Sequence, residues 1–469
     1  KIPIGYAHID NEDNINWIGI CVLKNYQGKG FGKQLFLYIL DYIKNNNIQN
    51  VKLTVDIDNY IALNMYLKNN FSIEKIHKNY YTLQLLESPL LEVSLGEAID
   101  KLTILDIKKK KIKDNRLKFV VKEYDILYYK LKNYINKHEY YYNILLDINK
   151  NIWEMQDEFR YSTNSEQKQT LCLKIIDEND RRFRVKKKIN NLCKSELKEQ
   201  KGYKPKKAFV LTHLGMGDCI TSIGAVRYLS TTHDEVHVVC KDKNKHNLID
   251  LYKDDIDIKI YPVHEDKDIS PRLGCNYEKF KKITKNFDLF MCGSHLFTKK
   301  PQPFSNIPFN FYTDLNIDVK YFWKYFHIHI SDKSKMLYNS IKEPYIFVHN
   351  SCSNGEVFTI NSISKILNIN ENDFLVINPC KNLYNDSDKY FNIAQSFVNK
   401  PMSYYIETII NSNIIVLTDS SFFCLSINLP IKTNKCYYVS RDNRNYDYLY
   451  DEKYFSKNKN KKKFQCLTI

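Results

Sequence analysis

Seven consecutive residues near the start of the chain have the composition of a loop that binds phosphate. The run is Gln27-Gly28-Lys29-Gly30-Phe31-Gly32-Lys33, with three alternating glycines. Glycine lets the backbone turn tightly and leaves no Cβ between the main chain and an anion. Where a helix follows such a loop, the free N–H groups of its first turn point at the phosphate oxygens. The sequence therefore predicts a phosphate-binding loop, against the plainer alternative of a glycine-rich surface turn.

The glycine spacing separates this loop from two common phosphate-binding types. A Walker loop needs Gly-Lys followed by Ser or Thr, whereas Gln34 follows Lys33. A dinucleotide-binding loop needs G-x-G-x-x-G, which the alternating glycines do not supply. The pattern that remains, Q-x-x-G-x-G, resembles the pyrophosphate loop of the GNAT N-acetyltransferases, which implies acetyl-CoA as the cofactor.

A second segment carries the same resemblance. Residues 59–71 are similar to the family's N-x-x-A-x-x-x-Y-x-x-x-G-F helix, with Asn70 in place of the usual glycine. The resemblance implies that Asn59 contacts the pantetheine arm and that Tyr66 donates a proton to the leaving thiolate. Core packing is the alternative role for Tyr66, because the chain contains 36 tyrosines.

The resemblance also assigns the other parts of an acetyl-transfer site. The strand at residues 20–22 is expected to pair with the pantetheine arm, and the Val22 N–H to polarise the thioester carbonyl. The general base stays open among His8, Asp10 and Glu12, with His8 as the candidate catalytic residue. The expected cofactor-binding residues are Ile20, Val22, Gln27, Gly28, Lys29, Gly30, Phe31, Gly32, Lys33 and Asn59.

A second glycine pair lies where a strand turns into a helix in the middle of the chain. Residues 213–220 read His-Leu-Gly-Met-Gly-Asp-Cys-Ile, and ligands of open α/β sheets bind beyond the carboxyl ends of strands. The G-x-G-D motif resembles the N-lobe loop of GT-B glycosyltransferases of the heptosyltransferase type. That resemblance implies that Asp218 is the general base for an acceptor hydroxyl. A helix cap is the alternative role for Asp218.

The C-lobe motif of the same family, T-D-S-G-x-x-H-x-A, has a partial match at residues 418–426. Thr418, Asp419 and Ser420 are kept, whereas serine, cysteine and serine replace the glycine, histidine and alanine. These departures leave the donor's identity open. The resemblance implies a donor diphosphate at this helix N-terminus. The expected nucleotide-sugar contacts are Gly215, Gly217, His349, Ser420 and Ser421.

The elements that must position these residues predict a multidomain chain of α+β, α and α/β segments. Residues 1–87 read β-β-loop-α-β-α-β-β, which is expected to be a truncated GNAT fold, because the family has a strand and two helices before this point. Residues 88–203 have apolar residues at helical spacing, which predicts a helical hairpin or bundle acting as a spacer. Residues 204–469 alternate strands and helices, which predicts a two-lobed, Rossmann-like GT-B domain with parallel sheets.

The boundaries of individual elements are also predicted. In the helical segment, Ser94–Glu97 has the pattern of a capping box, and helices are expected over 119–136, 140–159 and 166–197. Residues 93–113 and 179–182 resemble a small helical domain of uncharacterised function. One helix is expected to run from the G-x-G-D motif through Tyr228. The predicted strands of the last segment are 208–212, 236–240, 287–292, 345–349, 374–377 and 414–417.

Charge and cysteine content narrow the class of protein. The net charge of +16 comes mainly from lysines spread along the chain, so we expect no nucleic-acid partner. Twelve cysteines occur without a C-x-x-C pair, which favours reduced thiols over disulfides or a metal site. No apolar run reaches membrane-spanning length, which predicts a soluble cytoplasmic protein without a membrane partner. The basic C-terminal tail is expected to be disordered or solvated.

The combined motifs suggest one pathway. An N-acetyltransferase needs an amine and a glycosyltransferase needs a nucleotide sugar, so a nucleotide-linked amino sugar serves both, with 4-amino-4,6-dideoxyhexoses favoured by the GNAT relatives. The partners expected are a nucleotide-sugar donor, a glycan acceptor, and a second copy bound through the helical segment. Protein or peptide N-acetylation and a non-catalytic scaffold are the alternatives. The residue bias and domain order resemble a giant-virus protein of the mimivirus kind, which implies the host cytoplasm.

Overall fold

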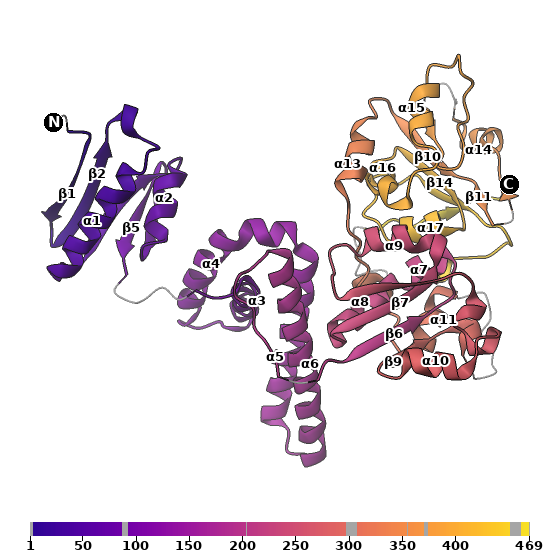
Figure 1. The fold of residues 1–469 in the computed structure, drawn as a ribbon, viewed down its shortest axis with the longest axis horizontal. Coiled ribbons are helices and arrows are strands. Elements are labelled where there is room, and N and C mark those ends of the chain that lie inside the picture. Colours follow the sequence, from indigo (N-terminus) through magenta and orange to yellow (C-terminus); the bar gives the residue numbers. More distant parts are fainter. Residues whose placement is uncertain are drawn as a thin grey trace. The chain divides into compact units, whose positions relative to one another are not determined.

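A computed structural model describes residues 3–86, 92–202, 204–296, 307–353, 355–369, 374–450 and 461–468 (Figure 1). The chain forms two compact units, Lys1–Val93 and Ser94–Ile469. The helical segment and the α/β segment therefore belong to one unit, and the glycine-rich loop belongs to the other. Each unit is described by itself.

The first unit is a five-stranded sheet with two helices. Its strands follow the order β1-β2-β3-β5-β4, in which only β2 and β3 are parallel neighbours. The predicted element order is confirmed. The elements are β1 Gly5–Glu12, β2 Ile15–Val22, the 3-10 turn η1 Lys24–Tyr26, α1 Phe31–Asn45, β3 Val51–Asp56, α2 Tyr60–Leu67, β4 Phe71–Ile76 and β5 Tyr80–Leu85.

The core of this unit follows from the periodicity of its elements. Alternate residues of β3 are buried and the others are not, as expected for a strand with one covered face. Helix α1 buries the stripe Phe36, Ile39 and Ile43. Phe36 packs against Tyr66 of α2 and Phe71 of β4, with ring centroids 5.0 and 5.9 Å apart. Both helices therefore share one apolar core.

The helical segment contains α3 Leu95–Lys111, α4 Leu117–Lys137, α5 Glu139–Tyr161 and α6 Ser165–Leu192. These helices match the predicted ones, except that α6 ends before Leu197. The Ser94 hydroxyl accepts the Glu97 N–H at 3.2 Å, so half of the capping box is present. The Glu97 carboxylate pairs instead with Lys186 of α6 at 2.6 Å, because a buried ammonium needs a countercharge.

Helix α6 is joined to the following α/β region by buried ion pairs. Lys188, with a side chain only 3% exposed, contacts Asp255 at 2.6 Å and Asp257 at 3.0 Å. Arg184 contacts Asp234 at 3.1 Å. A separate spacer was expected here, but this segment is a packed part of the second unit. The sequence did not indicate that α6 packs against the α/β region, because charged residues on a helix are ordinarily exposed to solvent.

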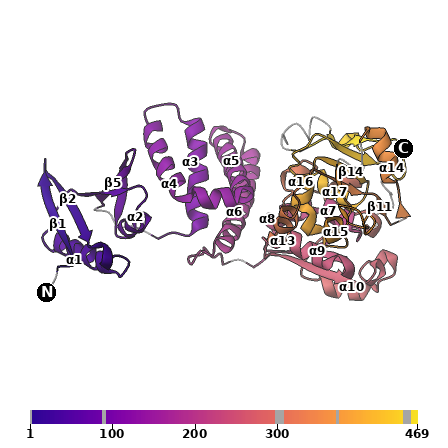
Figure 2. The same cartoon turned by 90° about the horizontal axis from the view of Figure 1, so that it is seen from above.

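The α/β segment contains two parallel sheets, which confirms the predicted fold class. The N-lobe sheet has the order β8-β7-β6-β9, and the C-lobe sheet has the order β13-β10-β14-β15-β16. Figure 2 shows helices packed around both sheets. The strands are β6 Lys207–Leu211, β7 Glu235–Lys241, β8 Ile258–Val263, β9 Asp288–Met291, β10 Tyr345–His349, β13 Leu375–Ile377, β14 Ile414–Thr418, β15 Cys436–Val439 and β16 Gln465–Cys466, with a small antiparallel pair, β11 Ser351–Cys352 and β12 Gly355–Glu356.

The connecting helices differ from the sequence prediction at one point near the candidate site. The single helix expected through Tyr228 is two helices, α7 and α8, which meet at Ser222. The helices of this region are α7 Met216–Thr221, α8 Ile223–Thr232, α9 Lys245–Leu251, α10 Tyr277–Thr284, α11 Ile307–Asp314, α12 Tyr321–Lys324, α13 Asp332–Asn339, α14 Ile360–Leu367, α15 Phe391–Ser396, α16 Ile406–Ile410 and α17 Ser421–Ser426.

The end of the chain corrects another expectation. Residues 461–463 belong to the basic tail that was predicted to be disordered or solvated, but Lys461 donates to the Asn428 carbonyl and burial lowers its pKa to about 8. Phe464 is buried, and β16 adds a parallel edge strand beside β15. The rest of the predicted tail, residues 457–460, lies outside the described residues. Within the described residues, no helix has both the length and the apolar character needed to cross a membrane.

Candidate functional site

The glycine-rich loop has the backbone geometry that its sequence predicted. Gly28 and Gly30 have φ angles of 75° and 84°, in the left-handed region that favours glycine. A Cβ built on either residue has no atom within 4 Å. The left-handed backbone therefore requires glycine at both positions, and the space beside each Cα is open to a ligand.

The N-terminus of α1 is prepared for an anion. Gly30 is the N-cap residue of α1, and no side chain caps the helix with a hydrogen bond. No acidic residue lies in the first turn. The N–H groups of Phe31, Gly32 and Lys33 have no acceptor in the helix, since the first turn of any helix leaves its amides unpaired. These amides carry the positive end of the helix dipole.

Strands β2 and β3 separate soon after they begin to pair. Their register contains only Asn16↔Val51 and Trp17↔Lys52, whereas β1 pairs with β2 along its whole length. The Asn16 N–H donates to Asn50 O on the β3 side at 3.0 Å. Because successive residues of a strand face opposite sides, the amides of Ile18, Ile20 and Val22 point to that same side. They form a row of hydrogen-bonding groups where β3 has diverged.

Gln27 connects the loop to this row. Its side-chain amide donates to Val22 O at 2.9 Å, which ties the loop to the end of β2. The sequence resemblance assigned Gln27 a cofactor contact, and the structure shows that its amide nitrogen already has a protein acceptor. Gln27 therefore positions the amides around it.

Tyr66 and Asn59 lie at opposite ends of α2. Burial raises the pKa of Tyr66, and its ring packs against Phe36 and Phe71, so the core-packing role is real and the phenol stays protonated at neutral pH. The Asn59 Oδ1 accepts the Ala62 N–H at 3.2 Å as the helix N-cap. Both residues have structural roles, and their contacts with a cofactor stay predictions.

The candidate bases of the acetyl-transfer site share one face of β1. His8 Nε2 lies 3.2 Å from Asp10 Oδ2. Glu12 lies two residues further along the strand, so its side chain is on the same face. A Cβ built on Gly19 of β2 would lie 2.1 Å from the His8 ring, whereas one on Gly5 would contact Leu35 of α1. The His8 side chain therefore lies across Gly19, on the sheet face opposite α1.

A cavity of about 650 Å³ between the two lobes collects the predicted glycosyltransferase residues. Residues that are about two hundred positions apart in the chain line it together. The six predicted residues in its wall are Gly215, Gly217, Asp218, His349, Ser420 and Ser421. It lies at the carboxyl ends of β6, β10 and β14, as expected for an open α/β sheet.

Asp218 lies in the first turn of α7, and its carboxylate lies beside the N-cap residue Gly215. A Cβ on Gly215 would lie 2.5 Å from Asp218 Oδ2, so the carboxylate folds back over the N-cap of α7. Burial raises the pKa of Asp218, and the nearby charges of His213 and Arg441 partly oppose that rise. A raised pKa suits a proton acceptor, since general bases work best with a pKa near the working pH.

Gly217 and His349 have packing roles besides lining the cavity. A Cβ on Gly217 would lie 3.5 Å from the Cys424 Sγ of α17, so this glycine lets α7 and α17 approach closely. His349 Nδ1 lies 3.0 Å from the Ser420 hydroxyl, and its ring packs against Phe422. Burial lowers the pKa of His349 to about 4, so the imidazole is neutral at physiological pH.

Sequence reasoning missed the cations of this cavity. Lys241, Lys243, Arg441 and Arg444 line it, and among the described lining residues only Asp218 and Asp419 supply negative charge. Lys241 ends β7, which was predicted, and Lys243 follows it. Arg441 and Arg444 follow β15, which was not among the predicted strands. Their position after strand ends was the available signal, because such positions meet at one edge of a parallel sheet.

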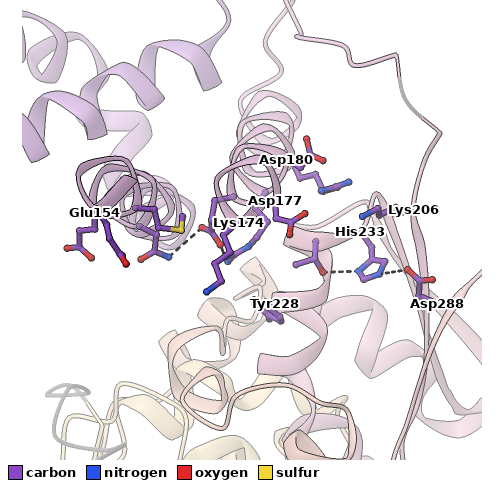
Figure 3. A pocket seen from close by; sticks show the side chains of 15 residues that line it. Glu154, Lys174, Asp177, Asp180, Lys206, Tyr228, His233 and Asp288 are labelled. Carbon is purple, nitrogen blue, oxygen red and sulfur yellow. Dashed lines mark hydrogen bonds and ion pairs between the residues drawn. The ribbon is translucent and has the colours of Figure 1, made fainter. Parts of the chain in front are cut away.

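A second cavity, of about 600 Å³, lies among α5, α6 and α8 (Figure 3). Lys206 precedes β6 and Asp288 begins β9, so it opens at the amino ends of these strands, away from the first cavity. His233 lies between Thr232 Oγ1 at 2.8 Å and Asp288 Oδ2 at 3.2 Å. None of the predicted site residues lines it.

Two family models match separate parts of the chain. Residues 2–71 match the model of the acetyltransferase (GNAT) family, and residues 90–210 match a family of unknown function (DUF6165). The second match covers the residues whose sequence resembles a domain of uncharacterised function. No curated protein matches the chain.

Solved structures are similar to separate parts of the chain. The ribosomal-protein-S18-alanine N-acetyltransferase from Escherichia coli has 16% identity, a TM-score of 0.17, and coverage of 19% of this chain and 67% of its own. The PaiA N-acetyltransferase from Thermoplasma acidophilum, solved with coenzyme A, has 23% identity, a TM-score of 0.16, and coverage of 17% of this chain and 52% of its own. The chain thus spans about half to two thirds of these enzymes.

Two glycosyltransferase structures are similar to a larger part. The iron-containing dodecameric glycosyltransferase TibC from enterotoxigenic Escherichia coli H10407 has 14% identity, a TM-score of 0.31, and coverage of 52% of this chain and 61% of its own. A family 9 glycosyltransferase from Veillonella parvula has 10% identity, a TM-score of 0.31, and coverage of 50% and 80%.

The left-handed glycine loop, the uncapped helix N-terminus and the diverging parallel strands all lie within or beside the matched residues. The N-terminal part of this chain is a GNAT acetyltransferase domain.

Proposed function

We propose that the N-terminal domain transfers the acetyl group of acetyl-CoA to the amino group of a nucleotide-linked amino sugar. The observation that carries this proposal is the continuous set of backbone amides running from Ile18, Ile20 and Val22 of β2 to the first turn of α1. An amide-rich pantetheine arm can pair with a strand edge, and a pyrophosphate suits helix amides beside glycine. Gly28 and Gly30 keep the space beside the loop free of side chains.

The residues of this site have distinct chemical tasks. Bound acetyl-CoA supplies a thioester, which an unprotonated amine attacks. The Val22 amide points into the gap beside β3 and is placed to donate to the thioester oxygen. Tyr66 is protonated, because burial raises the pKa of its phenol, and supplies a proton to the departing sulfur. His8, paired with Asp10, accepts the proton of the acceptor ammonium, directly or through water.

The same proposal assigns glycosyl transfer to the cavity between the lobes. Lys241, Lys243, Arg441 and Arg444 give this cavity an excess of positive charge, which suits the diphosphate of a nucleotide sugar. Asp218 faces the same space and has a raised pKa, which suits a base for an acceptor hydroxyl on a glycan. The neutral His349 and the hydroxyls of Ser420 and Ser421 add uncharged hydrogen-bonding groups.

We infer the substrate class by requiring that one molecule can serve both sites. Acetylation needs an amine, and glycosyl transfer needs a sugar linked to a nucleotide. A nucleotide-linked amino sugar, with 4-amino-4,6-dideoxyhexoses as the first members to examine, meets both requirements. The acetylated sugar would then be passed to a glycan by the second unit.

The test is an incubation of the full chain with acetyl-CoA and a panel of nucleotide-linked amino sugars or peptides with free N-termini. Mass spectrometry of the small-molecule products is the readout, because the twelve cysteines of the chain would react with thiol reagents. The proposal expects a mass increase of one acetyl group on at least one amino sugar. Acetylation of peptides alone would support peptide N-acetylation, and no acetylation with intact acetyl-CoA binding would support a scaffold.

A further inference from the structure

The aspartate of the partial T-D-S motif is fully engaged by the protein. Asp419 has a side chain that is 0% exposed and accepts the Arg441 N–H at 3.1 Å and the Arg441 Nε–H at 2.8 Å. Its other oxygen accepts the Tyr446 hydroxyl at 3.2 Å. Three donors from the segment after β15 therefore converge on one carboxylate, and Asp419 holds that segment against the end of β14.

The bond to Asp419 determines how Arg441 is presented. A guanidinium has five N–H donors in a rigid plane, and the carboxylate uses the Nε side. The Cys352 thiol of β11 interacts with the same guanidinium. The Arg441 side chain stays 24% exposed and lines the cavity between the lobes, so its remaining donors face that cavity.

Arg441 lies within electrostatic reach of Asp218, which comes from the other lobe. The charge of Arg441 is one of the influences that lower the pKa of Asp218 against the effect of burial. Burial also opposes the charge of Arg441 itself, but the Asp419 carboxylate outweighs it and raises the guanidinium pKa. A permanent positive charge and a carboxylate thus face one cavity from opposite lobes.

We propose that Arg441, oriented by Asp419 and Tyr446, binds the terminal phosphate of a nucleoside diphosphate and stabilises it as the leaving group of glycosyl transfer. This inference rests on the proposed function of the cavity. When the bond between the sugar carbon and the phosphate oxygen breaks, its electron pair stays on that oxygen. The acceptor hydroxyl forms the new bond to the sugar carbon and gives its proton to Asp218. The fork of Arg441 fits the two phosphate oxygens that gain charge.

A purely structural role for Arg441 is the competing explanation. Arg441 would then serve only to neutralise Asp419, because a buried carboxylate without a partner is strongly destabilising. The two explanations differ for the double variant Arg441→Gln/Asp419→Asn. It removes both charges, so it restores neutrality at the buried site but leaves no guanidinium in the cavity.

The experiment measures binding of ADP, GDP and UDP by calorimetry to the full chain and to three variants. Arg441→Lys keeps the charge beside Asp419 but loses the planar fork, so we expect about tenfold weaker binding of the preferred nucleotide. The double variant is expected to bind about tenfold more weakly or worse. Arg116→Gln is the matched control, because Arg116 also pairs with an aspartate, Asp114, but lies on the helical segment.

The outcomes separate the inference from the proposed function. If the unmodified chain binds none of the three nucleotides, the proposed donor site is wrong and the inference falls with it. If the unmodified chain binds one of them and the double variant binds it equally well, the donor site stands and Arg441 is structural. Thermal unfolding of each variant identifies any loss of binding that comes from loss of the fold.

Discussion

The side-chain amide of Gln27 donates a hydrogen bond to the main-chain carbonyl of Val22 over 2.9 Å. One contact thus closes the glycine-rich loop onto the strand whose amides face the gap beside β3. The proposed pyrophosphate site and the proposed thioester site are therefore held in one fixed relationship.

Replacing Gln27 tests that relationship. Gln27→Ala removes the bond to Val22 O, which costs about 1 kcal/mol, so acetyl-CoA affinity should fall by about fivefold with little change in stability. The measurement is calorimetric titration with acetyl-CoA. Gln49→Ala is the control, because the side-chain amide of Gln49 makes a long 3.4 Å bond to Asn47 O. Equal affinities for both variants would show that this bond does not organise the loop.

Gly30→Ala should damage the loop through its backbone. The φ angle of 84° costs a residue with a Cβ about 1 kcal/mol or more, and the new methyl group occupies the space proposed for phosphate. We expect weaker acetyl-CoA binding and a small loss of stability. Gly202→Ala is the control, because the φ of Gly202 is not positive and a Cβ there has no atom within 4 Å. An unchanged affinity in Gly30→Ala contradicts the assignment.

Tyr66→Phe separates catalysis from packing. The ring stays in contact with Phe36 and Phe71, so stability and acetyl-CoA affinity should be retained while the acetylation rate falls by about tenfold to a hundredfold. Because burial raises the pKa of Tyr66, the unmodified enzyme should show no loss of rate from Tyr66 deprotonation up to pH 9. Rates for the exposed control Tyr38→Phe should match the unmodified chain. A full rate in Tyr66→Phe assigns the residue to the core alone.

Gly215→Ala is expected to move Asp218 without unfolding the protein. The added Cβ would lie 2.5 Å from Asp218 Oδ2, and a carboxylate at the end of a side chain can rotate away. Glycosyl transfer should fall sharply, whereas thermal stability should change by less than about 1 kcal/mol. Gly202→Ala adds a Cβ with no atom within 4 Å and serves as the control. A retained transfer rate would mean that the carboxylate position over Gly215 is irrelevant to the reaction.

His349 should make the second unit less stable in acid. Its pKa is lowered by burial to about 4 in the folded protein, against about 6.5 when unfolded. The unfolded chain therefore binds more protons between these values, and stability falls as pH drops from 6.5 to 4, by about 3 kcal/mol for this residue. The pKa of His295 is also lowered to about 4, so His295 should reduce stability over the same pH range.

The check is urea unfolding at pH 7 and pH 5 for the unmodified chain and for His349→Gln. The variant should lose part of the pH dependence, because glutamine does not titrate. If both proteins show the same difference between the two pH values, His349 does not contribute to acid sensitivity.

Local sequence signals predicted the element order of the first unit and several buried strands of the second. β10, Tyr345–His349, forms at the predicted residues, because it is a short run dominated by apolar and β-branched side chains. The missed strand β8 contains Lys259 and Pro262, which weaken an apolar strand pattern. β16 follows a lysine-rich run and forms because β15 offers an edge for it, which no local pattern reveals.

The candidate sites also contain residues that the local sequence indicated and residues that it did not. Glycine spacing alone located the loop, since only backbone freedom at Gly28 and Gly30 is required. The motif that contains Asp419 suggested a site for the donor diphosphate, but the fold gives the oxygens of Asp419 to Arg441 and Tyr446. Arg441 and Lys243 were not singled out from the sequence, because their importance comes from lining the same cavity as Asp218.

What the sequence by itself determined was the kind and order of the local elements and the place of the anion-binding loop, since turn chemistry and apolar periodicity act over a few residues. Only the tertiary structure decided that β3 leaves β2 after Trp17, that the charges of α6 are buried against the N-lobe, and that cations from both lobes meet beside Asp218. These features depend on the pairing and packing of residues far apart in the chain, where burial and charge are set by neighbours that the local sequence does not contain.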